Sequence, residues 1–347
     1  MAVTLREVAK AAGVSPAAVS KVLHGSGSSV RVSAERAVQI RQVAKDLGYR
    51  PNALARNLRS SRTSTVGLIW ENFLGLSEGP LYFVHLLDGI ASQVLKHHYR
   101  LTILPELAAH DEILRSLGDG QLEGVIWCKL ARDEATLQLI HECPVPIVAL
   151  NAPAPCQETE ALFVACDNEG GIELAIDHLF KLGHRKFLFL QEGEEADTPD
   201  FVARRFGFTT ALQRRGIEPD PADVATWGWH LEGFDEWWGG NPEHTAVVCW
   251  SERIAARFLQ RCASEGIPVP ERFSVVGFDS TQFCDTTQPR LTAVKQPIFE
   301  MAAFATKTLF DMIAGQRPES HSAIFPCTLD VRDSTGIPSL KAEAITQ

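Results

Sequence analysis

Apolar residues in the first fifty positions recur at helical spacing in three short stretches, and each stretch carries its own start signal. The stretch 4–13 opens with the capping box Thr4-x-x-Glu7, and the stretch 15–23 opens with a serine N-cap followed by a proline. The stretch 33–48 again starts at a serine, and each of the three ends at or just before a glycine. This pattern predicts three short helices around one small core.

The first two predicted helices are joined by a tight, glycine-containing turn, which is typical of a helix-turn-helix. In that motif the second helix enters the major groove of DNA, and its N-terminal residues face the base edges. The residues expected on this face are Ser15, Pro16, Ala17, Ser20 and Lys21. Lys21 can donate hydrogen bonds to guanine, whereas Ala17 can contact only a thymine methyl group.

The segment 50–63 is rich in arginine and supports two interpretations. Asn52 can cap a helix of under two turns that places Leu54 and Leu58 one helical turn apart, with Arg56 and Arg59 beside them. Such a short helix is marginal alone in water. The segment is either a linker whose leucines touch the next domain, or a hinge helix that folds on DNA and inserts Leu58 into the minor groove.

From residue 65 the pattern changes to short apolar runs separated by amphipathic stretches. The runs predicted as buried strands are 66–70, 101–104, 124–127, 147–150, 187–190, 246–250 and 274–278. Helical patterns lie between them, as in 169–182, 199–215 and 251–265. The alternation predicts parallel α/β sheets in two lobes, with a ligand cleft between the lobes.

Charge divides the chain at the same place as the hydrophobic pattern. Residues 1–62 hold eleven of the 33 Lys and Arg residues but three of the 43 Asp and Glu residues, so this part carries +8 and the remainder −18. A basic head on an acidic body indicates a nucleic-acid reader. Contents of 45% hydrophobic and 22% charged residues exclude a disordered chain, and no apolar run approaches the length of a membrane helix.

The eight cysteines are scattered, without a C-x-x-C motif. Several lie in apolar runs, which indicates buried thiols in a reducing compartment, and the N-terminus lacks the apolar core of a signal peptide. We therefore expect a cytoplasmic protein. His178 and His184 are six residues apart and lie on different helical faces, so capping and packing roles are favoured over metal ligation. Neither a metal site nor a cofactor is predicted.

The sequence TLREVAKAAGVSPAAVSKVLHG at 4–25, followed by LGYRPNALARNLR at 47–59, resembles the N-terminus of the LacI/GalR family of bacterial transcription regulators. The resemblance extends to about residue 340. It implies a homodimer on a palindromic operator in double-stranded DNA, with paired hinge helices in the central minor groove and Leu58 at the intercalating position. The residues expected to contact DNA are Thr4, Ser15, Pro16, Ala17, Ser20, Lys21, Asn52, Ala55, Arg56, Leu58 and Arg59.

The family's body is similar to periplasmic sugar-binding proteins, in which the chain crosses between two lobes three times. The crossings are expected near residues 163, 293 and 326. The fold class is then an all-α helix-turn-helix head joined by a hinge helix to an α/β two-lobed, periplasmic-binding-protein-like effector domain.

The expected domains follow from these crossings. They are a helix-turn-helix domain at 1–50, a hinge helix at 51–62, an effector-binding and dimerisation domain at 63–340 and a tail at 341–347. The N-lobe comprises about 63–163 and 293–325, and the C-lobe about 164–292 and 326–340. The tail has no leucine heptads, so a dimer is expected in place of a coiled-coil tetramer.

By the resemblance, Arg204 corresponds to the family's ligand-binding arginine and Asp279 to its ligand-contacting acid. This pair suits a small polar effector such as a sugar or sugar derivative, and an interlobe salt bridge is the structural alternative. The chain differs from the family at other expected effector contacts, which are Glu71, Tyr82, Phe83, Asn151, Trp229 and Ser251. Trp229 belongs to a cluster with Trp227, Trp237 and Trp238, part of which is expected to be ordinary core.

Three functions are compatible with this organisation. The leading hypothesis is a ligand-controlled transcription regulator, in particular a repressor, whose effector changes lobe closure and hence the folding of the hinge helices. A solute-binding protein for transport is the second hypothesis, and the basic head argues against it. An enzyme with a Rossmann-like body is the third, but the chain lacks G-x-G-x-x-G after a strand, G-x-S-x-G and H-E-x-x-H. We therefore expect no catalytic residues.

Overall fold

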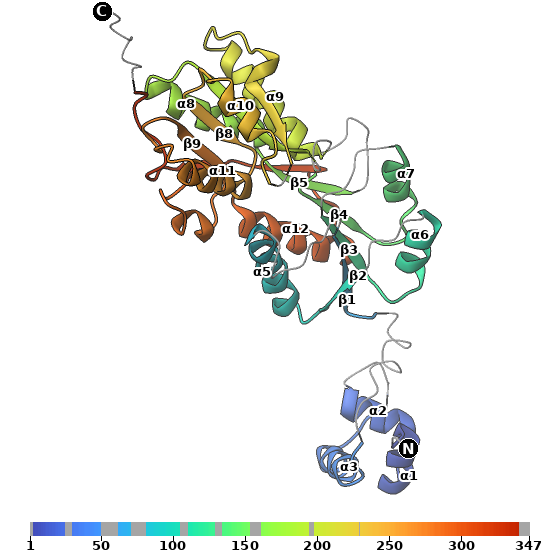
Figure 1. Cartoon of the computed structure of the whole chain (residues 1–347). Helices are drawn as coiled ribbons and strands as arrows, with labels where there is room; N and C mark the ends of the chain where they lie inside the picture. Colours follow the sequence, from blue (N-terminus) through green and yellow to red (C-terminus); the bar gives the residue numbers. More distant parts are fainter. Residues whose placement is uncertain are drawn as a thin grey trace, which may run out of the picture. The chain divides into compact units, whose positions relative to one another are not determined.

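The computed structural model describes residues 3–24, 30–49, 62–70, 81–104, 110–128, 134–152, 161–193, 198–228 and 230–339. The chain divides between Thr63 and Ser64 into two compact units, which we call the head (1–63) and the body (64–347). Within the described residues the head is all-helical, whereas the body contains all the strands (Figure 1).

The described part of the head consists of helices α1 (Leu5–Ala12), α2 (Pro16–His24) and α3 (Ala34–Asp46). The capping box is present, because the Glu7 N–H donates to Thr4 Oγ1 at 3.4 Å and the Thr4 N–H donates to the Glu7 carboxylate at 2.6 Å. Ser15 and Ser33 likewise accept hydrogen bonds from backbone N–H groups in the first turns of α2 and α3. The three predicted helices are confirmed.

A single glycine sets the turn between α1 and α2. Gly13 ends α1 with a φ of 63°, a left-handed conformation that is strained for a residue with a Cβ. After this turn the apolar faces of the three helices meet. The buried core that they form consists of Val8, Ala9, Ala12, Val19, Ile40 and Ala44.

The body contains two sheets, each of six strands within the described residues. The first, in spatial order, comprises β11 (Ser322–Phe325), β5 (Leu162–Cys166), β4 (Ile147–Leu150), β3 (Gly124–Cys128), β1 (Thr65–Trp70) and β2 (Arg100–Leu104). The second comprises β12 (Thr328–Asp330), β10 (Thr292–Lys295), β9 (Ser274–Asp279), β8 (Ala246–Cys249), β6 (Phe187–Glu192) and β7 (Val224–Trp227). All neighbouring strands are parallel except the antiparallel pair β10–β12. We call the halves built on the first and second sheets the N-lobe and the C-lobe.

All seven strands predicted from apolar runs are present, as are the three predicted helices between them. The apolar-run criterion misses β7, β11 and β12, which lie at sheet edges. An edge strand is less completely covered than a central one, so polar side chains are tolerated there and the apolar signal is weak. It also misses β5 and β10, although both are almost wholly buried.

The described chain passes between the lobes three times, after β5, after β10 and after β11. The first two crossings lie a few residues beyond the expected positions near 163 and 293, because β5 continues to Cys166 and β10 to Lys295. The three crossings lie side by side, since Cys166 is the register partner of Phe325 and Lys295 is the partner of Thr328.

Helices cover both faces of each sheet (Figure 1). In the N-lobe, α5 (Leu81–Lys96) and α12 (Ile298–Ile313) cover one face, and α6 (His110–Gly118) and α7 (Glu134–Glu142) the other. In the C-lobe, α8 (Asn168–Lys181) and α9 (Pro199–Gln213) lie opposite α10 (Phe234–Gly239) and α11 (Glu252–Ser264). Two short 3₁₀ helices, η2 (Pro221–Asp223) and η3 (Gln282–Asp285), complete this lobe within the described residues.

The two helices α5 and α12 approach unusually closely at one glycine. A Cβ at Gly89 would lie 2.5 Å from the backbone oxygen of Phe299 and 2.7 Å from the Cβ of Ala302. Only a residue without a side chain fits between these backbones, so Gly89 fixes how α12 lies on the N-lobe.

The two histidines considered as metal ligands hold the C-lobe together. His178 Nε2 lies 3.0 Å from Thr335 Oγ1. The buried His184 has its Nδ1 2.8 Å from Thr245 Oγ1 and its Nε2 2.9 Å from Ser274 Oγ. Burial lowers the pKa of both imidazoles. Among the described residues, no group of three or more His, Cys, Asp and Glu side chains is arranged to hold a metal ion.

The cysteines that the structure describes are free thiols, and Cys156 lies outside the described residues. Most are buried, in agreement with the apolar runs that contain them. In the described parts of the chain, no helix combines the length and apolar character required to cross a membrane.

Candidate functional site

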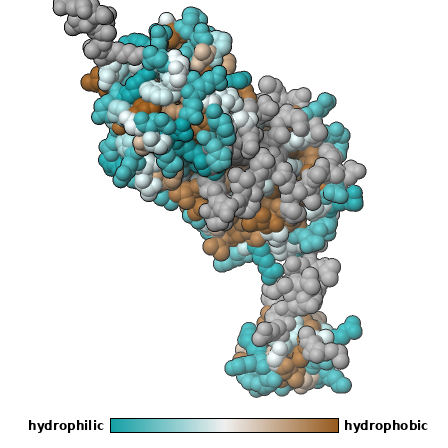
Figure 2. Space-filling model, viewed as in Figure 1, coloured by the Kyte–Doolittle hydropathy of each residue, from teal (hydrophilic) through white to brown (hydrophobic). Residues whose placement is uncertain are grey.

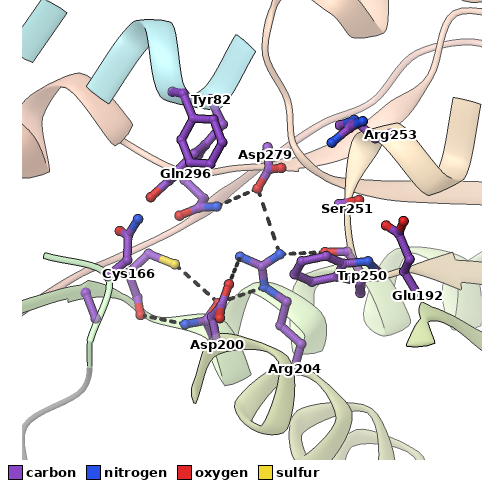
Figure 3. A pocket seen from close by; sticks show the side chains of 14 residues that line it. Tyr82, Cys166, Glu192, Asp200, Arg204, Trp250, Ser251, Arg253, Asp279 and Gln296 are labelled. Carbon is purple, nitrogen blue, oxygen red and sulfur yellow. Dashed lines mark hydrogen bonds and ion pairs between the residues drawn. The ribbon is translucent and has the colours of Figure 1, made fainter. Parts of the chain in front are cut away.

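A pocket lies between the two lobes of the body, and the space around it that no atom fills, open solvent included, is about 630 Å³. It is lined by residues at the carboxyl ends of strands from both sheets and by neighbouring helices (Figure 3). In open α/β sheets, this edge is where ligands bind. The lining residues are Tyr82, Phe83, Asn151, Ala165, Cys166, Asn168, Glu192, Asp200, Arg204, Trp250, Ser251, Arg253, Asp279 and Gln296.

Arg204 lies at the centre of this pocket and is only 3% exposed. Helix α9 begins with a proline at its first position. Asp200 and Arg204 are four residues apart on this helix and therefore lie on one face. The Arg204 guanidinium donates from Nε to Asn168 Oδ1 at 2.8 Å and from Nη1 to the carbonyl oxygen of Trp250. Its nitrogens also lie 3.8 Å from carboxylate oxygens of both Asp200 and Asp279. Arg204 is therefore a buried cation with acceptors on several sides.

Asp279 ends strand β9 and faces Arg204 across the pocket (Figure 3). Its backbone has a φ of 97°, which is strained for a residue with a side chain and turns the chain sharply at the pocket edge. Gln296, in the second crossing, donates from Nε2 to the Asp279 carboxylate at 2.6 Å. Burial raises the pKa of Asp279 to about 7, although the Arg204 charge acts in the opposite direction. This carboxyl group can thus bind a proton near neutral pH.

A second buried carboxylate lies behind Asp279. Ser251 caps α11, and Glu252 follows it at the first helical position. Glu252 accepts from the Thr281 N–H at 2.8 Å and from the thiol of Cys284 at 3.2 Å. Burial raises its pKa. Glu252 therefore fixes the turn that follows Asp279 and so supports the position of that carboxylate.

The N-lobe contributes a largely apolar wall. Tyr82 and Phe83, in the first turn of α5, are buried, and their ring centroids lie 5.6 Å apart. Trp70 packs edge-on against Phe83 at 4.9 Å. Burial raises the pKa of Tyr82 well above its usual value, so its phenol stays protonated. Asn151, directly after β4, has a φ of 61° and is the polar member of this wall.

Six predicted effector contacts lie around this one pocket, namely Tyr82, Phe83, Asn151, Arg204, Ser251 and Asp279. Glu71 and Trp229 lie outside the described residues. The other three clustered tryptophans pack together with C-lobe phenylalanines and do not line the pocket. They are Trp227, Trp237 and Trp238.

Several residues that the fold brings into the pocket were not predicted from the sequence. These are Ala165, Cys166, Asn168, Glu192, Asp200, Trp250, Arg253 and Gln296. A usable signal exists for some of them, because Glu192 ends an apolar run and Trp250 directly follows one. Asp200 could have been found from its i, i+4 spacing to Arg204. Gln296 depends on β10, which carries no strong apolar signal.

The described candidate DNA-contacting residues of the head are exposed or half-buried, unlike the buried residues of the pocket. Thr4, Ser15, Pro16 and Ala17 are exposed, and Ser20 and Lys21 are half-buried on α2. Ser15, Pro16 and Ala17 lie at the start of α2, which is the part of the second helix that a helix-turn-helix presents to a groove. The remaining candidates lie outside the described residues. They are Asn52, Ala55, Arg56, Leu58 and Arg59.

Comparison with known proteins matches both units to described families. Residues 4–52 match bacterial regulatory proteins of the lacI family, and residues 176–335 match a periplasmic binding protein-like domain. The chain is 30% identical over 343 residues to the HTH-type transcriptional regulator CelR of Thermobifida fusca, which covers 95% of this chain and 98% of that protein. It is 29% identical over 347 residues to the HTH-type transcriptional repressor CytR of Escherichia coli (strain K12), which covers 96% of each.

Solved structures show the same arrangement of elements. A complex of the transcriptional regulator CelR with cellobiose matches with a TM-score of 0.71 and 27% identity, over 96% of this chain and 99% of that one. The lac repressor dimer bound to operator and the anti-inducer ONPF matches with a TM-score of 0.82 and 22% identity, over 97% and 100%. This second likeness concerns the fold.

Proposed function

Because this chain belongs to the LacI family of bacterial regulatory proteins, and its relatives are transcription regulators and not enzymes, we propose that it binds a palindromic operator in double-stranded DNA as a homodimer under the control of a small polar effector. One observation carries the proposal. The same chain holds a basic head with an exposed groove-facing helix start and a body with a buried Arg204–Asp279 pair between two lobes.

The pocket favours a neutral, hydroxyl-rich effector such as a sugar. Its two arginines, Arg204 and Arg253, lie among three carboxylates, so a hydroxyl group finds both donors and acceptors, whereas a strongly charged ligand would leave one set uncompensated. Trp250 also lines the pocket, and its buried indole N–H has no hydrogen-bond partner within the described residues. The aromatic wall offers flat faces to a sugar ring. The relative CelR, whose complex holds cellobiose, makes that disaccharide the first probe.

Effector control follows from the position of the pocket. A ligand that touches both lobes favours one degree of closure, and it shifts the equilibrium by its difference in affinity for the two states. The body starts directly after the hinge segment, so a change in closure in a dimer would move the two hinge segments and oppose or favour insertion of Leu58 into DNA. The sign of this effect depends on which state the effector prefers.

Exposed apolar side chains support the homodimer. Leu95 on α5, Ile103 on β2 and Phe299 on α12 are between 43% and 72% exposed. Figure 2 shows apolar surface on this N-lobe part of the body. Apolar patches on a protein surface mark interaction sites, and a twofold dimer would cover the same patch on each copy.

The effector proposal is tested by thermal unfolding of the full chain with cellobiose, other neutral sugars, sugar acids and purines. All seven tryptophans lie in the body, so intrinsic fluorescence reports its unfolding alone. We expect a neutral sugar to raise the melting temperature, and Arg204→Lys to abolish the rise because Lys cannot reproduce the forked contacts. Arg214→Lys, on the exposed end of the same helix, is the matched control and should keep it. A rise that survives Arg204→Lys would contradict the proposed site.

The DNA proposal is tested by selecting fragments from a random-sequence pool with the full chain. We expect a palindromic consensus whose affinity falls steeply with salt, since basic side chains replace counterions on the phosphates. Repeating the measurement with the sugar identified above gives the sign of the switch. A full chain without salt-dependent DNA affinity would instead favour the solute-binding hypothesis, which its whole-length relatives argue against.

The hinge mechanism has its own test. Leu58→Ala should lower affinity for the selected DNA while leaving the sugar-induced thermal shift unchanged, because the leucine acts only in the minor groove. Leu47→Ala, a substitution at an exposed leucine beyond α3, is the control. Unchanged DNA affinity in the Leu58 variant would exclude the intercalation step. A regulator acting on bacterial DNA would work in the cytoplasm, as the cysteine pattern predicts.

A further inference from the structure

Two cysteines meet where the chain crosses between the lobes. Cys166 is the last residue of β5, and its register partner Phe325 is the last residue of β11. Cys327 follows two residues later, in the crossing to β12. The adjacent crossings bring the thiols of Cys166 and Cys327 close enough for each to shift the pKa of the other.

The two thiols have different surroundings. Cys166 is 6% exposed, lines the pocket and lies 3.5 Å from Asn168 Oδ1, the same oxygen that accepts from Arg204. Cys327 is half-buried and can be reached from solvent. The neighbouring Cys166 thiol lowers the pKa of Cys327, and the charge of Arg204 acts in the same direction. Accessible, thiolate-forming sulfur beside a second thiol is the arrangement in which cysteine oxidation is selective.

Cys249 and Cys262 provide an internal contrast. These two thiols are also neighbours, but both are buried in the C-lobe core. Burial raises the pKa of Cys262 to about 12 and raises that of Cys249 as well. They lack both access and a stabilised thiolate, so proximity of two cysteines alone does not make a reactive pair.

We propose that Cys166 and Cys327 form a reversible redox pair that hydrogen peroxide or another hydroperoxide closes to a disulfide. In the first step the Cys327 thiolate attacks peroxide, the O–O bond breaks, a sulfenic acid forms and the departing hydroxide takes a proton to become water. In the second step the Cys166 thiol attacks that sulfur, the S–O bond breaks and a second water leaves with the thiol proton. Two thiols and one peroxide thus give one disulfide and two waters, and a dithiol reductant restores the thiols.

The disulfide would act on the effector domain through two contacts. It would tie the first crossing to the third, and so restrict the relative movement of the lobes that these segments allow. It would also remove the thiol hydrogen beside Asn168, the residue that holds Arg204 in the pocket. Oxidation therefore bears on lobe closure whichever effector the pocket takes, and its chemistry can be tested without one.

The chemistry is tested on the reduced full chain with a small excess of hydrogen peroxide. Cleavage after glutamate releases Cys166 on peptide 161–169 and Cys327 on peptide 320–343, and neither peptide holds another cysteine. We expect these two peptides joined, with the loss of two hydrogens, and separated again by dithiothreitol. Cys143→Ser, a change at a half-buried thiol elsewhere in the N-lobe, should leave the crosslink unchanged. In Cys166→Ser, dimedone should trap a sulfenic acid on Cys327.

The conformational consequence is tested by amide hydrogen exchange of the reduced and oxidised full chain. We expect slower exchange in 161–169 and 320–332 after oxidation, by at least about tenfold at the slowest amides, and no such change in Cys327→Ser. Crosslinks spread over other cysteine pairs, or dimedone adducts at Cys143 but not Cys327, would overturn the proposed pair. An intact 166–327 crosslink with unchanged exchange would overturn its action on the lobes.

Discussion

The head and the body hold their candidate functional residues in opposite physical settings. In the head, Ser15, Pro16 and Ala17 are exposed at the start of α2 and are positioned by capping within the same few residues. In the body, Arg204 is 3% exposed and is held by Trp250, directly after β8, and by groups from β9, α8 and its own helix. One surface is built locally, and the other is assembled from distant segments.

This difference has an energetic consequence. A substitution on the exposed face of α2 should remove a proposed contact to DNA and leave the fold nearly unchanged, because surface positions contribute little to stability. A substitution at Arg204 leaves carboxylates buried without their cation, so it changes ligand binding and folding together. The two regions should therefore respond differently to the same kind of mutation.

The largest expected effect is that of Arg204→Met. Removing one partner of a buried ion pair leaves Asp200 and Asp279 uncompensated and should lower the free energy of unfolding of the body by about 3–5 kcal/mol. Urea unfolding followed by tryptophan fluorescence measures this. Arg214→Met, at an arginine whose side chain is 66% exposed, should cost less than about 1 kcal/mol. Equal losses in the two variants would show that burial does not decide the effect.

Asp279 should cause much of the pH dependence of the body's free energy of unfolding. Burial raises the pKa of Asp279 from 3.8 to about 7, so between these values the folded protein holds a proton that the unfolded chain releases. Its contribution to stability is complete at acid pH and is lost as pH rises through about 7. Asp279→Asn should therefore remove about 2 kcal/mol of the fall in unfolding free energy between pH 5 and 7.

Glu252 also contributes to the pH dependence of stability, because burial raises the pKa of its carboxyl group as well. Urea unfolding of wild type and Asp279→Asn at both pH values isolates the share of Asp279. If the two proteins lose the same stability between pH 5 and 7, the titrating group is elsewhere.

In the head, Lys21→Ala should change DNA binding and leave the stability of the body unchanged. We expect affinity for the selected DNA to fall by about 1–2 kcal/mol, roughly 5- to 30-fold, because a donor facing the base edges is lost. The tryptophan-detected unfolding of the body should not change. Lys45→Ala, a substitution at an exposed lysine near the end of α3, separates a general charge effect from a base contact. A shared, sequence-independent loss in both variants would assign Lys21 to phosphate.

The smallest effect concerns Thr4→Ala. Losing the side-chain half of the capping box should destabilise α1 by about 1 kcal/mol. Amide hydrogen exchange in residues 5–12 of the full chain measures this, and Gln42→Ala on α3 serves as an exposed control. An equal change in exchange throughout the body would mean that the head does not unfold as a separate unit.

Sequence-based prediction succeeds for features built from neighbouring residues and fails for those assembled from distant segments. The three head helices and the seven apolar strands are predictable because each start signal or apolar run lies within a few consecutive residues. The strands β7, β11 and β12 escape because edge strands carry mixed sequences. In the pocket, Trp250 and Glu192 adjoin predicted strands, whereas Gln296 comes into place only through a crossing.

By itself the sequence determined the helix-turn-helix, the charge division at residue 62 and the presence of two α/β lobes, because caps, charge counts and apolar periodicity are local properties. Tertiary structure alone decided that Asn168 and Asp279 enclose Arg204, and that Cys166 lies beside Cys327. The packing of α8 on α9 and the end of β9 bring Asn168 and Asp279 to Arg204, whereas the pairing of β5 with β11 brings together the two cysteines, which are 161 positions apart. Proximity between distant segments, and the pKa shifts that it causes, are properties of the packed fold.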